Sequence, residues 1–249
     1  MKKVVITGGC GFIGSHITEF FYNKYKNAQI IVYDKITYAA HIKNLDKIKK
    51  NRLKCLKFDI LNFKKLKQIT KNSDLLIHAA AESHVDNSYQ LGDDFVKTNV
   101  LGTKNVMQAC KENKVKKIIH ISTDEIYGEV FKGSFNENAK FNPSNPYSSS
   151  KAAAEMIVNG YIHSYKLPVI IIRGNNIFGT RQHPEKLISG CCWSFLNNKK
   201  FTIHGKGNQK RSFLYIKDFC EALDKIYKKS KIFQVYNIGS NFEYKNKEI

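Results

Sequence analysis

The chain has 249 residues, of which 42% are hydrophobic and 25% are charged, so it can bury the core of one large domain or of one domain with a small lobe. Its net charge of +20 comes mainly from lysines spread along the sequence, and arginine, which nucleic-acid readers use for bidentate base contacts, occurs only four times. We therefore expect no nucleic-acid partner, and no membrane partner because no apolar stretch approaches the thickness of a bilayer; the positive field should instead attract anionic substrates.

The first predicted element is a strand over Lys3–Thr7, which leads into a glycine turn and then an apolar-periodic helix that starts near Ser15. The turn contains Gly8, Gly11 and Gly14. Glycine permits a tight turn and the close approach of a pyrophosphate to the helix N-terminus. The segment therefore predicts a dinucleotide site.

A second predicted strand, Gln29–Tyr33, ends in Asp34, about 20 residues beyond the turn. An acid at this place is expected to bind the ribose of the cofactor. It would repel the 2′-phosphate of NADP, so the sequence favours NAD.

Strands and helices then alternate as far as Asn176, which predicts a parallel, doubly wound α/β sheet of the Rossmann type. The pattern breaks after Asn176, so we expect an NAD-binding domain over residues 1–176 and a smaller substrate lobe over 177–249. The further ranges are strands over Leu53–Asp59, Leu75–Ala81, Lys117–Ile121 and Pro168–Ile172, helices over Asp93–Asn113 and Pro146–Tyr165, and short apolar runs over Phe201–His204, Phe213–Ile216 and Val235–Ile238.

Acidic residues follow the apolar Lys117–Ile121 strand, in the sequence Ser122–Glu125. Open α/β sheets bind ligands at the carboxyl ends of their strands. Tyr147 and Lys151, four residues apart at a helix start, share one face of that helix. Two carboxylates, a phenol and an ammonium then converge on one cleft, which indicates proton and hydride chemistry.

The cysteines show no CxxC spacing, so we expect reduced thiols in a cytoplasmic protein, with Cys191–Cys192 packed in a helix. No metal site is predicted, because Glu82 and His84 have no cysteine or second acid spaced to complete one. We interpret His84 as structural and His120 as a core histidine with its hydrogen bonds satisfied.

The motifs as a set resemble the extended short-chain dehydrogenases/reductases, and within them the nucleotide-diphosphate-glucose 4,6-dehydratases. The Thr-Asp-Glu triplet at Thr123–Glu125 is the most specific of them. The resemblance implies bound NAD, a nucleotide-diphosphate-glucose substrate and a homodimer. Such proteins continue for several dozen residues more, so we expect an incomplete substrate lobe. The matching segments are Thr7–Gly14, Asp34–Tyr38, Ala80–Asp86, Ser122–Gly128, Pro146–Lys151, Pro184–Ile188 and Arg211–Tyr215.

The resemblance also implies roles for single residues. Tyr147, its pKa lowered by Lys151 and by the cofactor's positive ring, would take the proton of the sugar's 4-hydroxyl, which Thr123 can hydrogen-bond. Glu125 would remove the C5 proton, and a protonated Asp124 would release the 6-hydroxyl as water. The implied cofactor contacts are Gly8, Gly11, Phe12, Ile13, Gly14, Asp34, Lys35, Tyr38, Asp59, Ile60, Ala79, Ala80, Ala81, Thr98, Tyr147 and Lys151, and the implied substrate contacts are Ser83, Thr123, Asn176, Lys186, Leu187 and Arg211.

Several alternatives stay open at this point. A catalytically silent NAD-binding scaffold or sensor would share the fold, although it would be expected to lose the Tyr147/Lys151 pair. Related nucleotide-sugar epimerases and decarboxylases are opposed by Asp124. The nucleotide is undecided, because Arg173–Asn176 resembles enzymes acting on UDP-glucose and Ile238–Glu243 resembles those acting on dTDP-glucose.

Overall fold

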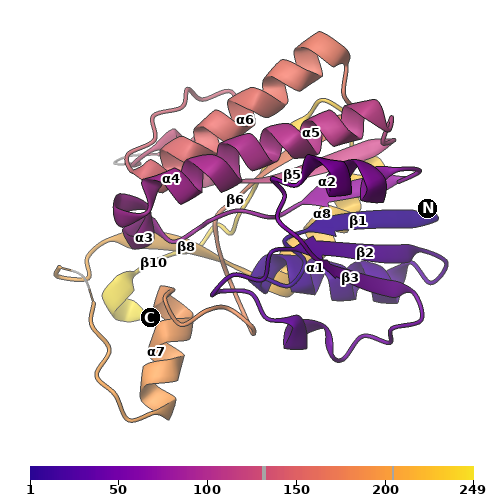
Figure 1. Cartoon of the computed structure of the whole chain (residues 1–249). Helices are drawn as coiled ribbons and strands as arrows, with labels where there is room; N and C mark the ends of the chain where they lie inside the picture. Colours follow the sequence, from indigo (N-terminus) through magenta and orange to yellow (C-terminus); the bar gives the residue numbers. More distant parts are fainter. Residues whose placement is uncertain (131–132, 204) are drawn as a thin grey trace.

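The computed structural model of the chain describes residues 1–130, 133–203 and 205–249. Its centre is a seven-stranded sheet in the order β3-β2-β1-β4-β5-β6-β9, with every neighbouring pair parallel (Figure 1). The order reverses direction between β1 and β4, where doubly wound sheets bind their ligands. The strands are β1 (Lys3–Thr7), β2 (Gln29–Asp34), β3 (Leu53–Lys57), β4 (Leu75–His78), β5 (Lys117–Thr123), β6 (Val169–Gly174) and β9 (Val235–Ile238).

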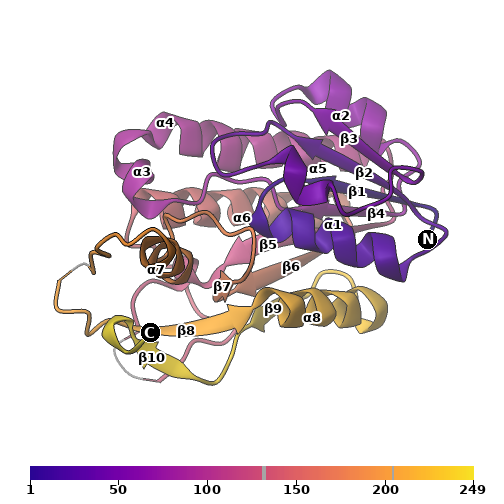
Figure 2. The same cartoon turned by 90° about the horizontal axis from the view of Figure 1, so that it is seen from below.

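Helices cover both faces of this sheet, as the nearly continuous apolar strands require. Along β1, Val4 and Ile6 pack into one buried cluster and Val5 into another on the opposite face. The first face is covered by α1 (Phe12–Lys24) and α8 (Ile216–Lys229), and the second by α2 (Phe63–Thr70), α4 (Gly92–Phe95), the π-helix η2 (Val96–Gly102), α5 (Thr103–Glu112) and α6 (Pro146–Tyr165) (Figure 2).

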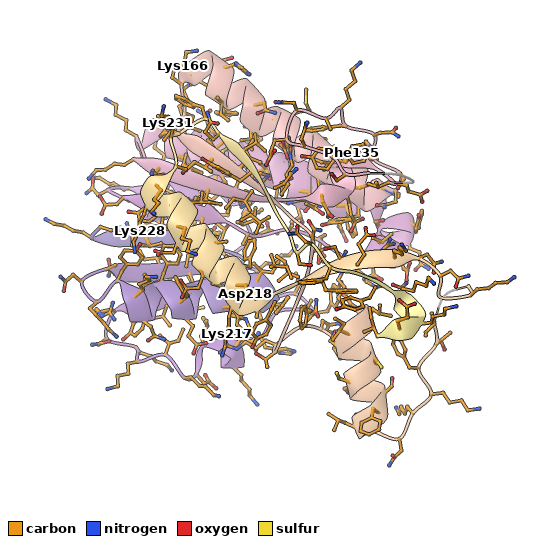
Figure 3. All side chains as sticks on the ribbon, turned by 180° about the vertical axis from the view of Figure 1, so that it is seen from behind. Phe135, Lys166, Lys217, Asp218, Lys228 and Lys231 are labelled. Atoms are coloured by element: carbon orange, nitrogen blue, oxygen red, sulfur yellow. The ribbon has the colours of Figure 1, made fainter. Side chains whose placement is uncertain are left out.

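Seen from behind, α8 runs across the face of the sheet from Asp218 to Lys228, and Lys166 lies at the C-terminal end of α6 (Figure 3).

Within the described residues, none of the helices combines the length and the apolar character that crossing a bilayer requires.

A smaller part of the molecule lies beside the carboxyl ends of the main strands (Figure 2). It contains a three-stranded sheet in the order β10-β8-β7, in which β8 is parallel to β7 and antiparallel to β10. Its elements are β7 (Asn176–Phe178), α7 (Leu187–Leu196), β8 (Lys210–Tyr215), β10 (Glu243–Lys245) and the 3₁₀ turn η4 (Asn246–Glu248), and the remaining short helices of the chain are η1 (Ile42–Leu45), α3 (Val85–Gln90) and η3 (Asp124–Tyr127).

The predicted parallel, doubly wound fold is confirmed. Not all of the range 177–249 expected for the second lobe lies in the smaller part. Helix α8 packs on the main sheet, and β9 joins that sheet by pairing with β6. The predicted helix Asp93–Asn113 is interrupted by the π-helical turn η2. The apolar run at Phe201–Ile203 has no regular structure, and His204 lies outside the described residues. Cys191 is half-buried and Cys192 exposed, so these thiols are not the packed pair that was expected.

Candidate active site

The glycine turn between β1 and α1 cannot accept side chains where the backbone approaches its neighbours. Gly8 has a φ of +73°, and a Cβ there would lie 2.6 Å from the backbone nitrogen of Ala80. A Cβ on Gly14 would lie 2.0 Å from the carbonyl oxygen of Gly8. In the described segment 1–130, no side chain caps the start of α1, whose first turn also has no acidic residue. The helix N-terminus therefore presents N–H donors suited to an anion.

Asp34 ends β2 beside this turn and is held there by backbone donors. The N–H of Cys10 donates to Oδ2 at 2.8 Å, and the N–H of Ile36 donates to Oδ1 at 2.7 Å. Burial raises the pKa of Asp34, while these backbone hydrogen bonds act in the opposite direction. The neighbouring Lys35 forms an ion pair with Asp59 at 2.9 Å.

One cavity of about 370 Å³ runs along the carboxyl ends of the strands, from the glycine turn to β8. That volume is typical of a site for a small molecule. Tyr38 is the one predicted contact outside the lining given for this cavity; its ring is about half exposed, and its hydroxyl accepts a hydrogen bond from Asn87 at 3.2 Å. The predicted residues that line the cavity are Gly8, Gly11, Phe12, Ile13, Gly14, Asp34, Lys35, Asp59, Ile60, Ala79, Ala80, Ala81, Ser83, Thr98, Thr123, Asp124, Glu125, Tyr147, Lys151, Asn176, Lys186, Leu187 and Arg211.

The Thr-Asp-Glu triplet stands where β5 turns into η3. The N–H of Glu125 donates to the Thr123 hydroxyl oxygen at 3.2 Å, which caps the start of η3. The Thr123 hydroxyl lies 3.4 Å from Oδ1 of Asp124. Burial, together with the adjacent negative charge of Glu125, raises the pKa of Asp124 to about 6. A pKa of about 6 allows Asp124 to hold and release a proton in mildly acidic to neutral solution.

Tyr147 and Lys151 lie on the first turns of α6, which begins at a capping box made by Asn145 and Ser148. The Lys151 ammonium donates to the carbonyl oxygen of Ile121 at 2.8 Å, so the helix is tied to β5 next to the triplet. Burial lowers the pKa of Lys151 to about 8.

The pKa of Tyr147 is the reverse of the expectation, because the surrounding protein raises it above the ordinary value. Burial is the largest cause, followed by the negative charge of Glu125, and a hydrogen bond with Thr123 acts the other way. The sequence showed the Tyr147/Lys151 spacing but could not show the burial of the phenol or its closeness to two acids.

Buried polar side chains behind the triplet were missed by the sequence reasoning. The Ser122 hydroxyl donates to Oε2 of Glu155 at 2.8 Å, and Glu155 forms an ion pair with Arg173. Glu155 is fully buried and Arg173 is 3% exposed. Asn99, in the π-helix η2, donates to the Ser150 hydroxyl at 2.8 Å. The positions of Glu155 and Ser150 on α6, near Tyr147 and Lys151, are the signal that could have found them.

On the substrate side, the predicted contact Lys186 lies next to Glu185 and near His183, two groups that were not predicted. Lys186 is mostly buried, which lowers its pKa, and its ammonium donates to the carbonyl oxygen of Ser83 at 2.7 Å. Glu185 lies 3.4 Å from Nδ1 of His183 and 4.0 Å from Nδ1 of His84. These contacts join the strand-end loop after β4 to the segment that precedes α7.

The two histidines interpreted from sequence differ in outcome. The ring of His84 accepts a hydrogen bond from the N–H of Asn87 at 3.4 Å and caps α3, which is a structural role. The expectation for His120 is wrong: among the described residues neither ring nitrogen has a hydrogen-bond partner, although the side chain is buried. Its neighbour His78 takes the polar partners instead, with Thr7 at 2.7 Å and Thr103 at 2.9 Å.

Comparison with known proteins gives consistent matches over almost the whole chain. The family model described as GDP-mannose 4,6 dehydratase matches residues 5–249. A dTDP-D-glucose 4,6-dehydratase of Dictyostelium discoideum is 45% identical over all of this chain, which spans 61% of that relative's length. A trifunctional Arabidopsis thaliana protein named for UDP-glucose 4,6-dehydratase is 41% identical over 97% of the chain, which covers 38% of it.

A solved structure shows the same arrangement. The dTDP-glucose 4,6-dehydratase DesIV from Streptomyces venezuelae, crystallised with NAD, superposes with a TM-score of 0.95 at 33% identity, over 99% of this chain and 78% of that one. The family model matches this chain from residue 5 to residue 249. The chain therefore belongs to the nucleotide-sugar 4,6-dehydratase family of the extended short-chain dehydrogenases/reductases.

Proposed function

We propose that the protein is an NAD-dependent lyase that converts a nucleotide-diphosphate-glucose into the 4-keto-6-deoxy sugar nucleotide. One observation carries this proposal: Tyr147 and Lys151 line the same cavity as the adjacent acids Asp124 and Glu125. The first pair suits oxidation at a sugar hydroxyl, and the second suits elimination of water next to the new carbonyl.

The cofactor end of the cavity fits NAD. The uncapped start of α1 can hold the pyrophosphate, and Asp34 can accept hydrogen bonds from the adenosine ribose. A 2′-phosphate would meet the carboxylate of Asp34, which favours NAD over NADP. When bound, NAD would supply the hydride acceptor for sugar C4 and the hydride donor for C6.

Tyr147 is the proposed base for the 4-hydroxyl, and Thr123 would hydrogen-bond the same oxygen. Burial and the negative charge of Glu125 raise the pKa of Tyr147, so its phenolate form needs positive charge nearby. The Lys151 ammonium and the positive nicotinamide ring would provide that charge.

Glu125 and Asp124 would then divide the elimination between them. The 4-keto group acidifies the C5 hydrogen, which Glu125 removes as a base. Asp124, with a pKa of about 6, holds the proton that the departing 6-hydroxyl needs to leave as water.

We propose that Lys186, Leu187, Asn176 and Arg211 form the nucleotide-sugar side, within a substrate lobe that consists of β7, α7, β8 and β10. Lys186 and Arg211 carry the positive charge that a diphosphate requires. The six cysteines are free thiols, which fits the proposed cytoplasmic location.

We further propose a homodimer that forms through the outer surface of α6 and the adjacent η2 and α5, which we call the helical layer over α6. Large apolar side chains stand exposed along this layer, including Met156 on α6 at 60% and Leu101 on η2 at 51%. Exposed apolar groups gathered on one face are typical of an interaction surface.

The proposed activity is tested by incubating the purified chain separately with UDP-glucose and dTDP-glucose. Formation of a 4-keto product, read from its absorbance in alkali, is expected with at least one of them, and the ratio gives the base preference. Tyr147→Phe is the control and should lower the rate by about 100-fold or more. A folded protein that binds NAD but makes no keto sugar from either nucleotide would instead favour the silent scaffold.

A further inference from the structure

Two cysteines that are far apart in the sequence meet beneath the cofactor end of the cavity. Cys10 belongs to the glycine turn, and Cys55 lies in the middle of β3. Their Sγ atoms are 3.5 Å apart, and both are free thiols. A disulfide requires an S–S distance of about 2.05 Å, so the sulfurs need to close by roughly 1.5 Å.

The two thiols are not equivalent. The Cys10 side chain is fully buried, whereas Cys55 is partly exposed. The contact between the two sulfurs lowers the pKa of Cys55, and the same contact, with burial, raises the pKa of Cys10. Since a peroxide reaches the partly exposed thiol first, Cys55 is the nucleophile of the pair and the buried Cys10 is the resolving thiol.

The backbone of Cys10 organises the ribose side of the cofactor site. Its N–H donates to Oδ2 of Asp34 at 2.8 Å. Its carbonyl oxygen accepts from the N–H of His41 at 3.1 Å and from Nδ2 of Asn44 at 2.9 Å. Closure of the disulfide that carries the Cys10 backbone toward β3 would strain three hydrogen bonds, one of which positions the carboxylate expected to hold the ribose.

We propose that Cys10 and Cys55 form a hydroperoxide-sensitive dithiol, whose oxidation to a disulfide weakens the binding of NAD at the Asp34 side of the glycine turn. The effect on NAD rests on the proposed function, whereas formation of the disulfide does not. Nothing in the proposed dehydration uses either thiol, so the pair would act on cofactor retention alone.

The oxidation balances with a hydroperoxide as the only co-reactant. The Cys55 thiolate attacks one peroxide oxygen, the O–O bond breaks, and a sulfenic acid forms as hydroxide leaves and takes up a proton to become water. The Cys10 thiol then attacks the Cys55 sulfur, the S–O bond breaks, and a second water leaves. The two thiols lose two electrons in total, and the peroxide gains them.

The test treats the purified full chain with hydrogen peroxide and maps its peptides without reduction. We expect a cross-link between the Cys10 and Cys55 peptides and an intact mass lower by about 2 Da. Titration with NAD should give a dissociation constant that is raised roughly tenfold or more, as for the loss of one hydrogen bond to a charged group. Dithiothreitol should reverse both changes.

Variants separate this site from other thiols. Cys55→Ser should bind NAD as the untreated protein does and lose the response to peroxide, whereas Cys192→Ser, which removes an exposed thiol on α7, should keep it. Cys10→Ser should leave a Cys55 sulfenic acid that dimedone traps.

Absence of the Cys10–Cys55 cross-link, or a cross-linked protein that binds NAD unchanged, would overturn the proposal. A reduced protein that fails to bind NAD would overturn the proposed function and the link to the cofactor together. Disulfide mapping needs no cofactor and would still report on the thiol pair.

Discussion

Asp124 and Glu125 are neighbours in the chain, and we propose different tasks for them in the reaction. Burial and the charge of Glu125 favour the protonated form of Asp124, while the backbone N–H of Glu125 is bound to the Thr123 hydroxyl. The raised pKa of Asp124 suits the proposed role of acid.

Isotope exchange at C5 of the sugar separates these two roles. Glu125→Gln cannot accept the C5 proton, so turnover should fall by roughly 10²- to 10⁴-fold, and deuterium uptake at C5 from heavy water should fall with it. Asp124→Asn should lose elimination to a similar degree but keep more of the exchange. Mass spectrometry of the recovered sugar measures both, and wild-type deuterium uptake in Glu125→Gln would show that another residue is the base.

The raised pKa of Asp124 also predicts a dependence of stability on pH. The folded protein holds this proton up to about pH 6, whereas the unfolded chain releases it near the ordinary aspartate pKa of 3.8. The folded state therefore binds more protons between these values, and the free energy of unfolding falls as pH rises through this window. Above it, the charged carboxylate destabilises the protein by about 1 to 3 kcal/mol.

Asp124→Asn removes this penalty. Its free energy of unfolding in urea, relative to wild type, should therefore increase between pH 4 and pH 7. Asp46→Asn, at an exposed aspartate, serves as the control and should follow the wild-type curve. Parallel curves for Asp124→Asn and wild type would contradict the assignment of the proton to Asp124.

At this scale the sequence predicted which residue types meet but not their environments. The spacing of Tyr147 and Lys151 and the strand-end position of the triplet were sufficient to place them in one cleft. The raised pKa of Tyr147 and the unpaired ring of His120 depend on packing between segments that are distant in the chain, which periodicity does not report.

At the scale of elements, α6, which carries Tyr147 and Lys151, is connected to the sheet through a buried ion pair. Glu155, about one turn beyond Lys151 on α6, accepts hydrogen bonds from Arg173 of β6 and from Ser122, the residue before the triplet. Such a pair holds the end of β5 in a fixed relation to α6.

Breaking this ion pair should cost far more than breaking one at the surface. Glu155→Gln leaves the Arg173 charge buried without its carboxylate, so the free energy of unfolding should fall by about 3 kcal/mol or more. Glu112→Gln is the matched control: its partner Lys67 lies at 2.8 Å with its side chain 55% exposed, and the loss should stay below about 1 kcal/mol. Urea titrations compare the two, and equal losses would contradict a structural role for the buried pair.

The ranges of most elements follow from local pattern, as β1 (Lys3–Thr7) and α6 (Pro146–Tyr165) show, because apolar runs, glycines and caps are local signals. The π-helical turn η2 could not be foreseen. Its Gly102 packs against Ile60, so close that a Cβ would lie 2.4 Å from that side chain, and Asn99 bonds to α6. Both contacts are set by neighbouring elements rather than by propensity.

At the scale of the whole molecule, β9 comes after β7 and β8 of the smaller sheet in sequence but pairs with β6 in the main one, so the residues after Asn176 do not all lie in the smaller part. A short apolar run such as Val235–Ile238 carries no signal for the sheet that it joins.

The exposed apolar side chains of the helical layer over α6 predict that the protein associates with a second copy of itself.

Met156→Glu should convert the dimer into a monomer, because a charge placed in an apolar interface must be desolvated. Phe195→Glu, at an 81% exposed site on α7, should leave the dimer intact. Analytical ultracentrifugation distinguishes these outcomes. A wild-type protein that is monomeric at micromolar concentration would contradict the interface.

The central claim is that one site oxidises C4 and reduces C6 of the same sugar. The most direct measurement uses nucleotide-diphosphate-glucose that carries deuterium at C4. We predict a 4-keto product in which that deuterium appears in the C6 methyl group, with no net consumption of NAD. Deuterium found again at C4 of a sugar with inverted configuration, or a product without deuterium at C6, would contradict the account.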